Sequence, residues 1–175
     1  MYEIELKAFI PRNRLKKILK LANQKFKFIK EEIKNDIYYY NSEKLIRIRK
    51  SNISDEIITF KIKSLDKDME INKEIEFKVD KMDNFISFIK EMNFKILYKK
   101  IKKSLIYKKD DLNIEINEIH NLGFFLEIEK LIYIDNKNEC DLAKKEIYET
   151  IKEFKLQDNI EKKSYFELLS NQLKE

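Results

Sequence analysis

Charged and apolar residues alternate along much of this chain, and a two-residue period is typical of a β-strand with one apolar and one charged face. Glu3-Ile4-Glu5-Leu6-Lys7 shows the pattern near the start of the sequence. Because the pattern recurs in about eight segments, strands should outnumber helices, and they can close into a small barrel. We predict strands at residues 2–9, 26–40 with a break near Asn35, 44–50, 56–63, 69–79, 94–109, 112–119 and 124–134.

Apolar residues at helical spacing predict helices as well. Pro11 suits the first turn of one helix, and Asp80 and Ser164 stand where a side chain can cap two others. The predicted helices cover about residues 11–23, 80–92, 139–154 and 164–169. The length of 175 residues is that of one domain, so residues 1–175 are predicted to form a single domain.

One short segment of the sequence is nearly repeated later in the chain. Glu3-Ile4-Glu5-Leu6-Lys7 leads into the first predicted helix, and Glu74-Ile75-Glu76-Phe77-Lys78 leads into the second. Two interpretations stay open. The chain is either a duplicated unit of strand, helix and strands that closes around a shared axis, or a chance repetition in a sequence rich in Lys, Glu and Ile.

The charged strand faces are sorted by sign. Arg47 and Arg49 flank Ile48 on one strand, while other strands carry only carboxylates at such positions. A solvated outer face is the common arrangement for an antiparallel sheet, but such a face usually mixes signs within a strand. If the apolar faces pack outward against helices, the charges line a wet tunnel. We therefore predict an α+β fold, a closed or nearly closed antiparallel eight-stranded β-barrel with a charged interior and flanking helices.

The scarcity of certain residues excludes several kinds of site. A single glycine, Gly123, excludes glycine-rich phosphate loops and dinucleotide fingerprints, which need several glycines. One histidine (His120) and one cysteine (Cys140) rule out a zinc cluster and a disulfide within the chain. Phosphate would then be held by side chains, and a divalent metal by carboxylates.

Inside a tunnel, carboxylates suit a hard divalent cation, and arginine and lysine suit a polyanion. The predicted ligands of Mg²⁺ or Mn²⁺ are Glu3, Glu5, Glu127 and Glu129. The residues predicted to face a polyanion are Lys7, Arg47, Arg49, Lys61 and Lys63.

Several of these segments resemble the CYTH, or triphosphate tunnel metalloenzyme, superfamily. Glu3-x-Glu5-x-Lys7 resembles the ExExK signature of that superfamily. The stretches IRIR at 46–49, TFK at 59–61 and EIE at 74–76 follow in the family's order. NLGFFLEIE at 121–129 resembles the family's GLGxF[LV]E[IL]E segment, and together with SYFELL at 164–169 it is most similar to the class IV adenylate cyclase branch.

The resemblance implies a metal-dependent tunnel enzyme that binds a triphosphate, often as a homodimer. It implies the same four carboxylates as metal ligands and Lys7, Arg47, Arg49 and Lys61 as triphosphate ligands. We predict Lys7 and Lys61 as catalytic residues. The remaining predicted site residues are Lys63, Lys102 and Lys103 toward the triphosphate and Glu74, Glu76, Glu115 and Asn117 as further tunnel lining.

Two positions depart from the family pattern. Asn117 stands where the family usually has an aspartate, and Ser104 stands where it has an arginine, for which Lys100 or Lys103 can compensate. The leading prediction is an adenylate cyclase that converts ATP to cyclic AMP and pyrophosphate. The alternatives are an inorganic tripolyphosphatase or a nucleoside or thiamine triphosphatase, and a non-catalytic nucleotide or polyphosphate binding module.

Composition bears on partners and location. Lysine and arginine number 37 against 32 aspartate and glutamate, so the net charge of +5 is a mild bias and predicts no nucleic-acid partner. Charged residues at positions 3 and 5 do not fit a secretory signal, and no long uncharged stretch could span a bilayer, so a cytoplasmic location is expected. Aromatic residues near the tunnel mouth are candidates to stack on an adenine ring.

Overall fold

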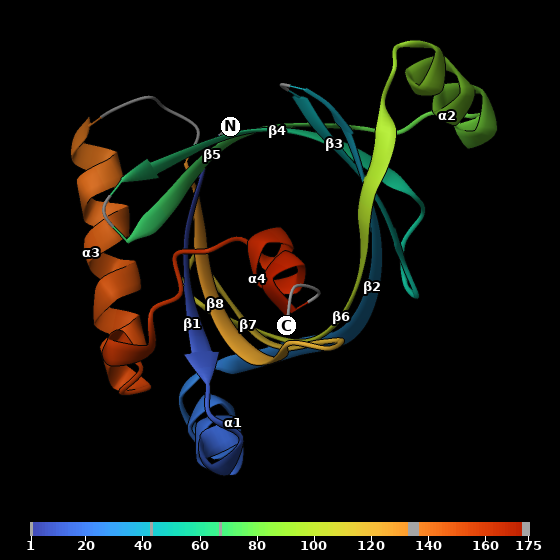
Figure 1. Ribbon diagram of the computed structural model, residues 1–175. Helices are drawn as coiled ribbons and strands as arrows, with labels where there is room; N and C mark the ends of the chain where they lie inside the picture. The colour runs from blue at the N-terminus through green and yellow to red at the C-terminus, as the bar shows by residue number, and fades with distance from the viewer. Residues whose placement is uncertain (1, 43, 67, 133–136, 173–175) are drawn as a thin grey trace.

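A computed structural model describes residues 2–42, 44–66, 68–132 and 137–172. Its strands close into one antiparallel barrel in the order β1-β5-β4-β3-β2-β6-β7-β8, so the predicted eight-stranded barrel is confirmed (Figure 1). The strands are β1 (Tyr2–Ile10), β2 (Lys27–Asn41), β3 (Lys44–Ser51), β4 (Ile57–Asp66), β5 (Met69–Phe77), β6 (Lys95–Lys109), β7 (Leu112–Ile119) and β8 (Gly123–Ile132).

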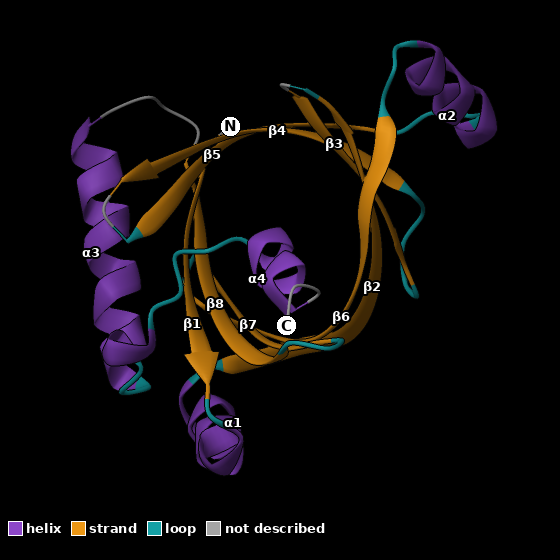
Figure 2. Cartoon of the chain, in the orientation of Figure 1, coloured by secondary structure: helices purple, strands orange, loops and turns teal. Residues whose placement is uncertain are grey.

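Helices lie against the outside of the barrel, with one exception (Figure 2). α1 (Leu15–Lys25) and α3 (Lys137–Glu153) lie on the side of β1, and α2 (Met82–Glu91) projects from the opposite side. α4 (Tyr165–Gln172) lies within the outline of the barrel opening. Within the described ranges, every helix is too short or too polar to cross a membrane.

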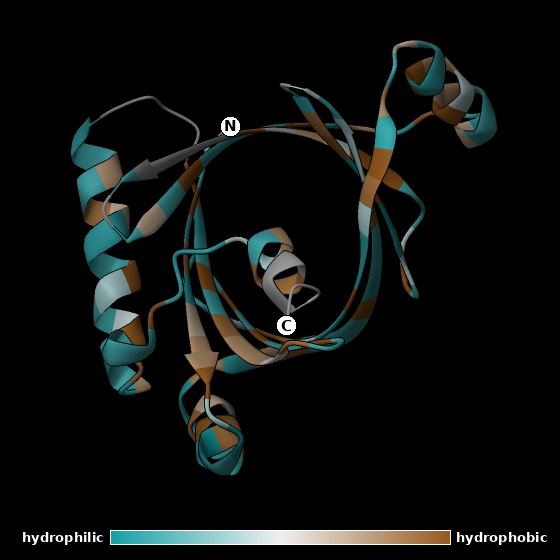
Figure 3. Cartoon of the chain, in the orientation of Figure 1, coloured by the Kyte–Doolittle hydropathy of each residue, from teal (hydrophilic) through white to brown (hydrophobic). Residues whose placement is uncertain are grey.

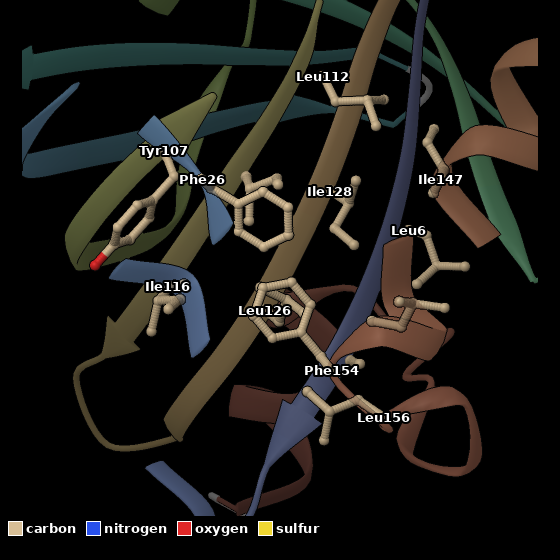
Figure 4. Close-up of a cluster of buried hydrophobic side chains, with 14 of the residues drawn as sticks. Leu6, Phe26, Tyr107, Leu112, Ile116, Leu126, Ile128, Ile147, Phe154 and Leu156 are labelled. Carbon is tan, nitrogen blue, oxygen red and sulfur yellow. The ribbon is translucent and has the colours of Figure 1, made fainter. Parts of the chain in front are cut away.

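The core lies between the outer face of the barrel and these helices. Leu6 of β1 and Ile128 of β8 are register partners, and they share a buried cluster with Ile147 of α3 (Figure 4). A second cluster joins Ile48 and Ile58 to Ile89 of α2. Apolar residues therefore face outward toward the helices, while hydrophilic and hydrophobic residues alternate along the strands (Figure 3).

The strand order has an internal two-fold symmetry. Exchanging β1–β4 with β5–β8 leaves the order of neighbours unchanged, and each half reads strand, helix and three strands. This topology supports the duplicated unit over chance repetition. The two halves contact each other where β1 pairs with β5 and where β2 pairs with β6. In these two registers, the residues that correspond by the symmetry lie opposite each other at Glu3 and Asn72 and at Lys34 and Lys102. The structural counterpart of Glu5 is thus Glu74. The sequence similarity instead aligns Glu3 with Glu74, so it is shifted from the structural correspondence by one strand period.

Some local predictions need correction. β2 runs unbroken through Asn35, because it is hydrogen bonded to β6 along most of its length, and its irregularities lie at Phe28/Lys30 and Tyr38/Tyr39 instead. α2 has Lys81 at its N-cap, so Asp80 is not the cap. The first helix begins as a 3₁₀ turn at Arg12–Arg14. Ser164 does precede α4, as predicted.

Candidate functional site

The barrel encloses a cavity of about 580 Å³ that charged side chains line from several strands. The alternating charged faces therefore point inward, and the interpretation of a solvated outer face is wrong for these strands. Among the predicted residues, the lining comprises Glu3, Glu5, Lys7, Arg47, Arg49, Glu74, Glu76, Lys102, Glu115, Glu127 and Glu129.

Three of the lining carboxylates form one cluster. Glu5 of β1 and Glu129 of β8 are register partners, and Glu3 lies two residues from Glu5 on the same face of β1. One oxygen from each of the three lies within 4.8 Å of the others. Asn72 donates to Glu3 at 3.3 Å, and Asn113 donates to Glu129. Three oxygen donors at such spacing fit a hard divalent cation.

The electrostatics of this cluster favour a bound cation. Burial and the negative charges of Glu3 and Glu115 raise the pKa of Glu129 to about 8. The nearby like charges thus disfavour ionisation of Glu129, and a divalent cation would remove that cost. We refer to Glu3, Glu5 and Glu129 below as the acidic cluster.

Glu127, the fourth predicted metal ligand, lies in a different environment. Its carboxylate accepts hydrogen bonds from Lys102 at 2.6 Å, from Asn117 at 2.8 Å and from the hydroxyl of Tyr165. Burial alone would raise the pKa of Glu127, but the adjacent Lys102 outweighs it and holds that pKa at about 2. The structure thus places Glu127 beside a lysine and not within the acidic cluster.

Buried ion pairs link two walls of the barrel. Lys34 donates to Glu115 at 2.7 Å, and Lys102 donates to Glu115 at 2.7 Å as well as to Glu127. All four side chains are at most 8% exposed, so each charge depends on its partners. Lys34 and Glu115 also line a second cavity of about 770 Å³, which opens beside α3. The ion-pair chain therefore lies between two cavities of one barrel.

A group of cations lines the cavity from β1, β3 and β6. Arg49 makes two hydrogen bonds to Asp36, at 2.7 and 2.9 Å, while Arg47 donates to Thr59 at 2.9 Å. Lys100 lies 3.3 Å from Asp36. We call Lys7, Arg47, Arg49 and Lys100 the cationic wall. Guanidinium and ammonium groups at such density suit the oxygens of a polyphosphate.

Several predicted residues take other places. Lys103 is wrongly predicted as a tunnel residue, because it lies on the outer face of β6 and pairs with Glu31 at 2.9 Å. Asn117 is buried and donates to Glu127. Lys61 and Lys63 pair in register with Glu74 and Asn72, and their side chains lie outside the described residues.

Sequence reasoning missed residues on β2 and α4. Lys34 and Asp36 lie on the inner face of β2. Their spacing of one strand period could have indicated this, but the predicted break near Asn35 divided the strand between them. Tyr165 also enters the cavity, although nothing in the sequence around it indicated an inward side chain.

The C-terminal helix α4 reaches into the mouth of the cavity. Ser164 caps it, since the Ser164 hydroxyl accepts from the Glu167 N–H at 3.2 Å and the Ser164 N–H donates to Glu167 at 2.6 Å. The ring of Tyr165 lies under two ammonium groups, 4.7 Å from Lys7 and 4.9 Å from Lys100. The cap thus positions an aromatic residue next to the cationic wall.

Comparison with known proteins gives a consistent result. A family model described as the CYTH domain matches residues 1–165. A Methanocaldococcus jannaschii protein named "putative adenylate cyclase" is 33% identical over 96% of this chain and 98% of its own length. A conserved hypothetical protein from Pyrococcus furiosus has a TM-score of 0.78 and 30% identity, covering 95% of this chain and 99% of its own. A Pyrococcus horikoshii protein has a TM-score of 0.81 and 26% identity, covering 97% and 99%.

Proposed function

Because the chain belongs to the CYTH domain family, whose members typically act on triphosphates, we propose that it is a metal-dependent adenylate cyclase that converts ATP to cyclic AMP and pyrophosphate. The observation that carries the proposal is that one cavity is lined by both the acidic cluster and the cationic wall. The name of the Methanocaldococcus jannaschii relative supports the choice of reaction.

In this reaction the ribose 3′ oxygen attacks the α-phosphorus and loses its proton. The bond between the α-phosphorus and the oxygen that bridges to the β-phosphorus breaks, and pyrophosphate leaves with that oxygen. Lys7, Arg47 and Arg49 would hold the phosphate oxygens and offset the charge that develops on the leaving group. Glu3, Glu5 and Glu129 would hold Mg²⁺ or Mn²⁺, which supplies charge neutralisation to the phosphates when bound.

A triphosphatase is the second candidate. Lys34 and Glu115 line both this cavity and the second one, so the charged lining continues along the barrel. In that reaction water attacks the terminal phosphorus, and no nucleoside is required. Both reactions use the same charges, and they differ in how far along the barrel the substrate lies.

The deciding experiment is to incubate the protein with ATP, and separately with tripolyphosphate, in Mg²⁺ or Mn²⁺ and to resolve the products by phosphorus NMR. Cyclic AMP with pyrophosphate is the expected result, and Glu5→Gln should abolish it. Glu31→Gln, which alters an exposed carboxylate on the outside of β2, is the matched control and should leave turnover intact.

Orthophosphate release would instead establish the triphosphatase. Metal-independent binding without turnover of either compound would overturn both enzymatic candidates and leave a binding module.

A further inference from the structure

Three aromatic rings are stacked in series beside the cationic wall. The rings of Tyr38 on β2 and Tyr98 on β6 are parallel, with centroids 4.3 Å apart and an interplanar angle of 6°. Phe166 of α4 covers the other side of Tyr98, with centroids 5.0 Å apart and an angle of 33°. Tyr98 is thus fixed on one face by a strand residue, while its second face meets a residue of the helix at the cavity mouth.

The stack lies next to the groups that suit phosphate. Tyr38 and Tyr98 line the same cavity as Arg47 and Lys100. The Lys100 ammonium donates to the Tyr38 hydroxyl at 3.1 Å, so a cation and the aromatic stack are in direct contact. A triphosphate held on the cationic wall would therefore have apolar ring surface within reach of whatever group is attached to it.

We propose that Tyr98 and Phe166 form an aromatic clamp for the base of a nucleoside triphosphate, with Tyr38 supporting Tyr98 from behind. The clamp rests on the proposed function of this cavity and specifies its substrate class, a nucleotide in place of inorganic tripolyphosphate. Base–aromatic stacking is sequence-tolerant because every base offers a π-face, so the clamp accepts different bases and favours the larger purines.

Entry of a base requires a small movement of α4. A ring sandwiched between two others needs their planes about 7 Å apart, twice a carbon contact of roughly 3.5 Å. The ring centroids of Tyr98 and Phe166 are 5.0 Å apart, which is an upper limit for the separation of the two ring planes, and the rings are tilted by 33°. The planes must therefore move apart by at least about 2 Å, which displacement of one short helix can supply.

The test compares the affinities of hydrolysis-resistant methylene analogues of ATP and of tripolyphosphate, measured by calorimetry with Mg²⁺. Tyr98→Leu and Phe166→Leu should each weaken binding of the ATP analogue roughly tenfold, as loss of one stacked ring predicts, and leave tripolyphosphate binding within about twofold. Tyr98→Phe keeps the ring and should bind the ATP analogue like the unaltered protein. Phe88→Leu, on the exposed face of α2, is the matched control and should change neither affinity.

Retained tripolyphosphate binding also reports that each variant is folded. Equal losses for both ligands in the leucine variants, or no loss for the ATP analogue, would overturn the clamp while leaving the proposed triphosphate site in place. If the unaltered protein bound neither ligand, the proposed function itself would fail, and the clamp with it.

Discussion

At the scale of single residues, Glu129 connects the acidic cluster to pH. Burial together with Glu3 and Glu115 raises its pKa to about 8, so its carboxyl holds a proton below that pH in the absence of a cation. The unfolded chain loses the same proton near the ordinary value of 4.5. The native state therefore binds the proton more tightly, and the free energy of unfolding of the metal-free protein should fall as pH rises from about 4.5 to about 8.

A cation must displace that proton, which gives a test of the acidic cluster. Mn²⁺ affinity should rise with pH between 6 and 8 by up to about tenfold per pH unit, as release of one proton requires. Glu129→Gln should bind Mn²⁺ more weakly and with little dependence on pH across this interval. Calorimetric titration in two buffers of different ionisation enthalpy counts the protons released. An equally steep pH dependence in Glu129→Gln would contradict this assignment of the proton.

The two residues that depart from the family pattern are related to each other in the structure. Ser104 and Asn117, the two positions that differ from the family pattern, are register partners on β6 and β7. In the first half of the barrel, Asp36 and Arg49 face each other in the corresponding place as an ion pair. The sequence showed two separate losses of charge, whereas the register shows one neutral pair. Sequence alone could not reveal this, because pairing between strands is set by the closed barrel.

At the scale of elements, β6 shows how alternation decides the environment of neighbouring lysines. Lys102 points inward and is 6% exposed between two glutamates, whereas Lys103 points outward and is 50% exposed beside Glu31. The strand period predicted inward and outward faces, and most of the acidic and basic residues predicted to face inward from it line the cavity. The prediction failed for Lys103, because the positive charge of this residue was given more weight than its place in the alternation. It also failed for β2, because this long strand was divided at Asn35.

The two lysines provide a matched pair of substitutions. Lys102→Met should lower the free energy of unfolding by about 3–5 kcal/mol, because it removes the ammonium group that the buried carboxylates of Glu115 and Glu127 share and leaves Glu115 with Lys34 as its remaining partner. Lys103→Met breaks only an exposed ion pair and should change the free energy of unfolding by about 1 kcal/mol or less. Urea unfolding at neutral pH measures both. Equal effects would mean that the buried ion-pair chain contributes no more than a surface pair.

At the scale of the whole molecule, the two halves of the barrel share a topology but differ in charge. Arg47 faces Thr59 between β3 and β4, and in the corresponding place Glu115 faces Glu127 between β7 and β8. The repeated strand order was visible in the sequence as strand, helix and strands. The placement of these charges around the cavity was not, since it depends on which strands become neighbours when the sheet closes.

The presence of the acidic cluster and the cationic wall in one cavity predicts joint stabilisation by a cation and a polyanion. Mg²⁺ together with tripolyphosphate, at about 100 times the dissociation constant, should add about 2.7 kcal/mol of stability. That corresponds to a rise in Tm of roughly 5–10 °C for a chain of this size. Differential scanning calorimetry should show a smaller rise with either component alone, and Glu5→Gln should remove the Mg²⁺ contribution. An equal rise with sodium sulfate at matched ionic strength would argue against a specific site.

The position of β1 in the barrel also has a consequence for biosynthesis. β1 pairs with β5 on one side and with β8 on the other, so that Tyr2 lies opposite Ile132. A ribosome therefore exposes β1 long before β8 exists to pair with it, and the acidic cluster, which draws on both strands, cannot assemble until the barrel closes. Because such distant pairings are slow to form, closure should limit the rate at which newly made chains become able to bind a cation.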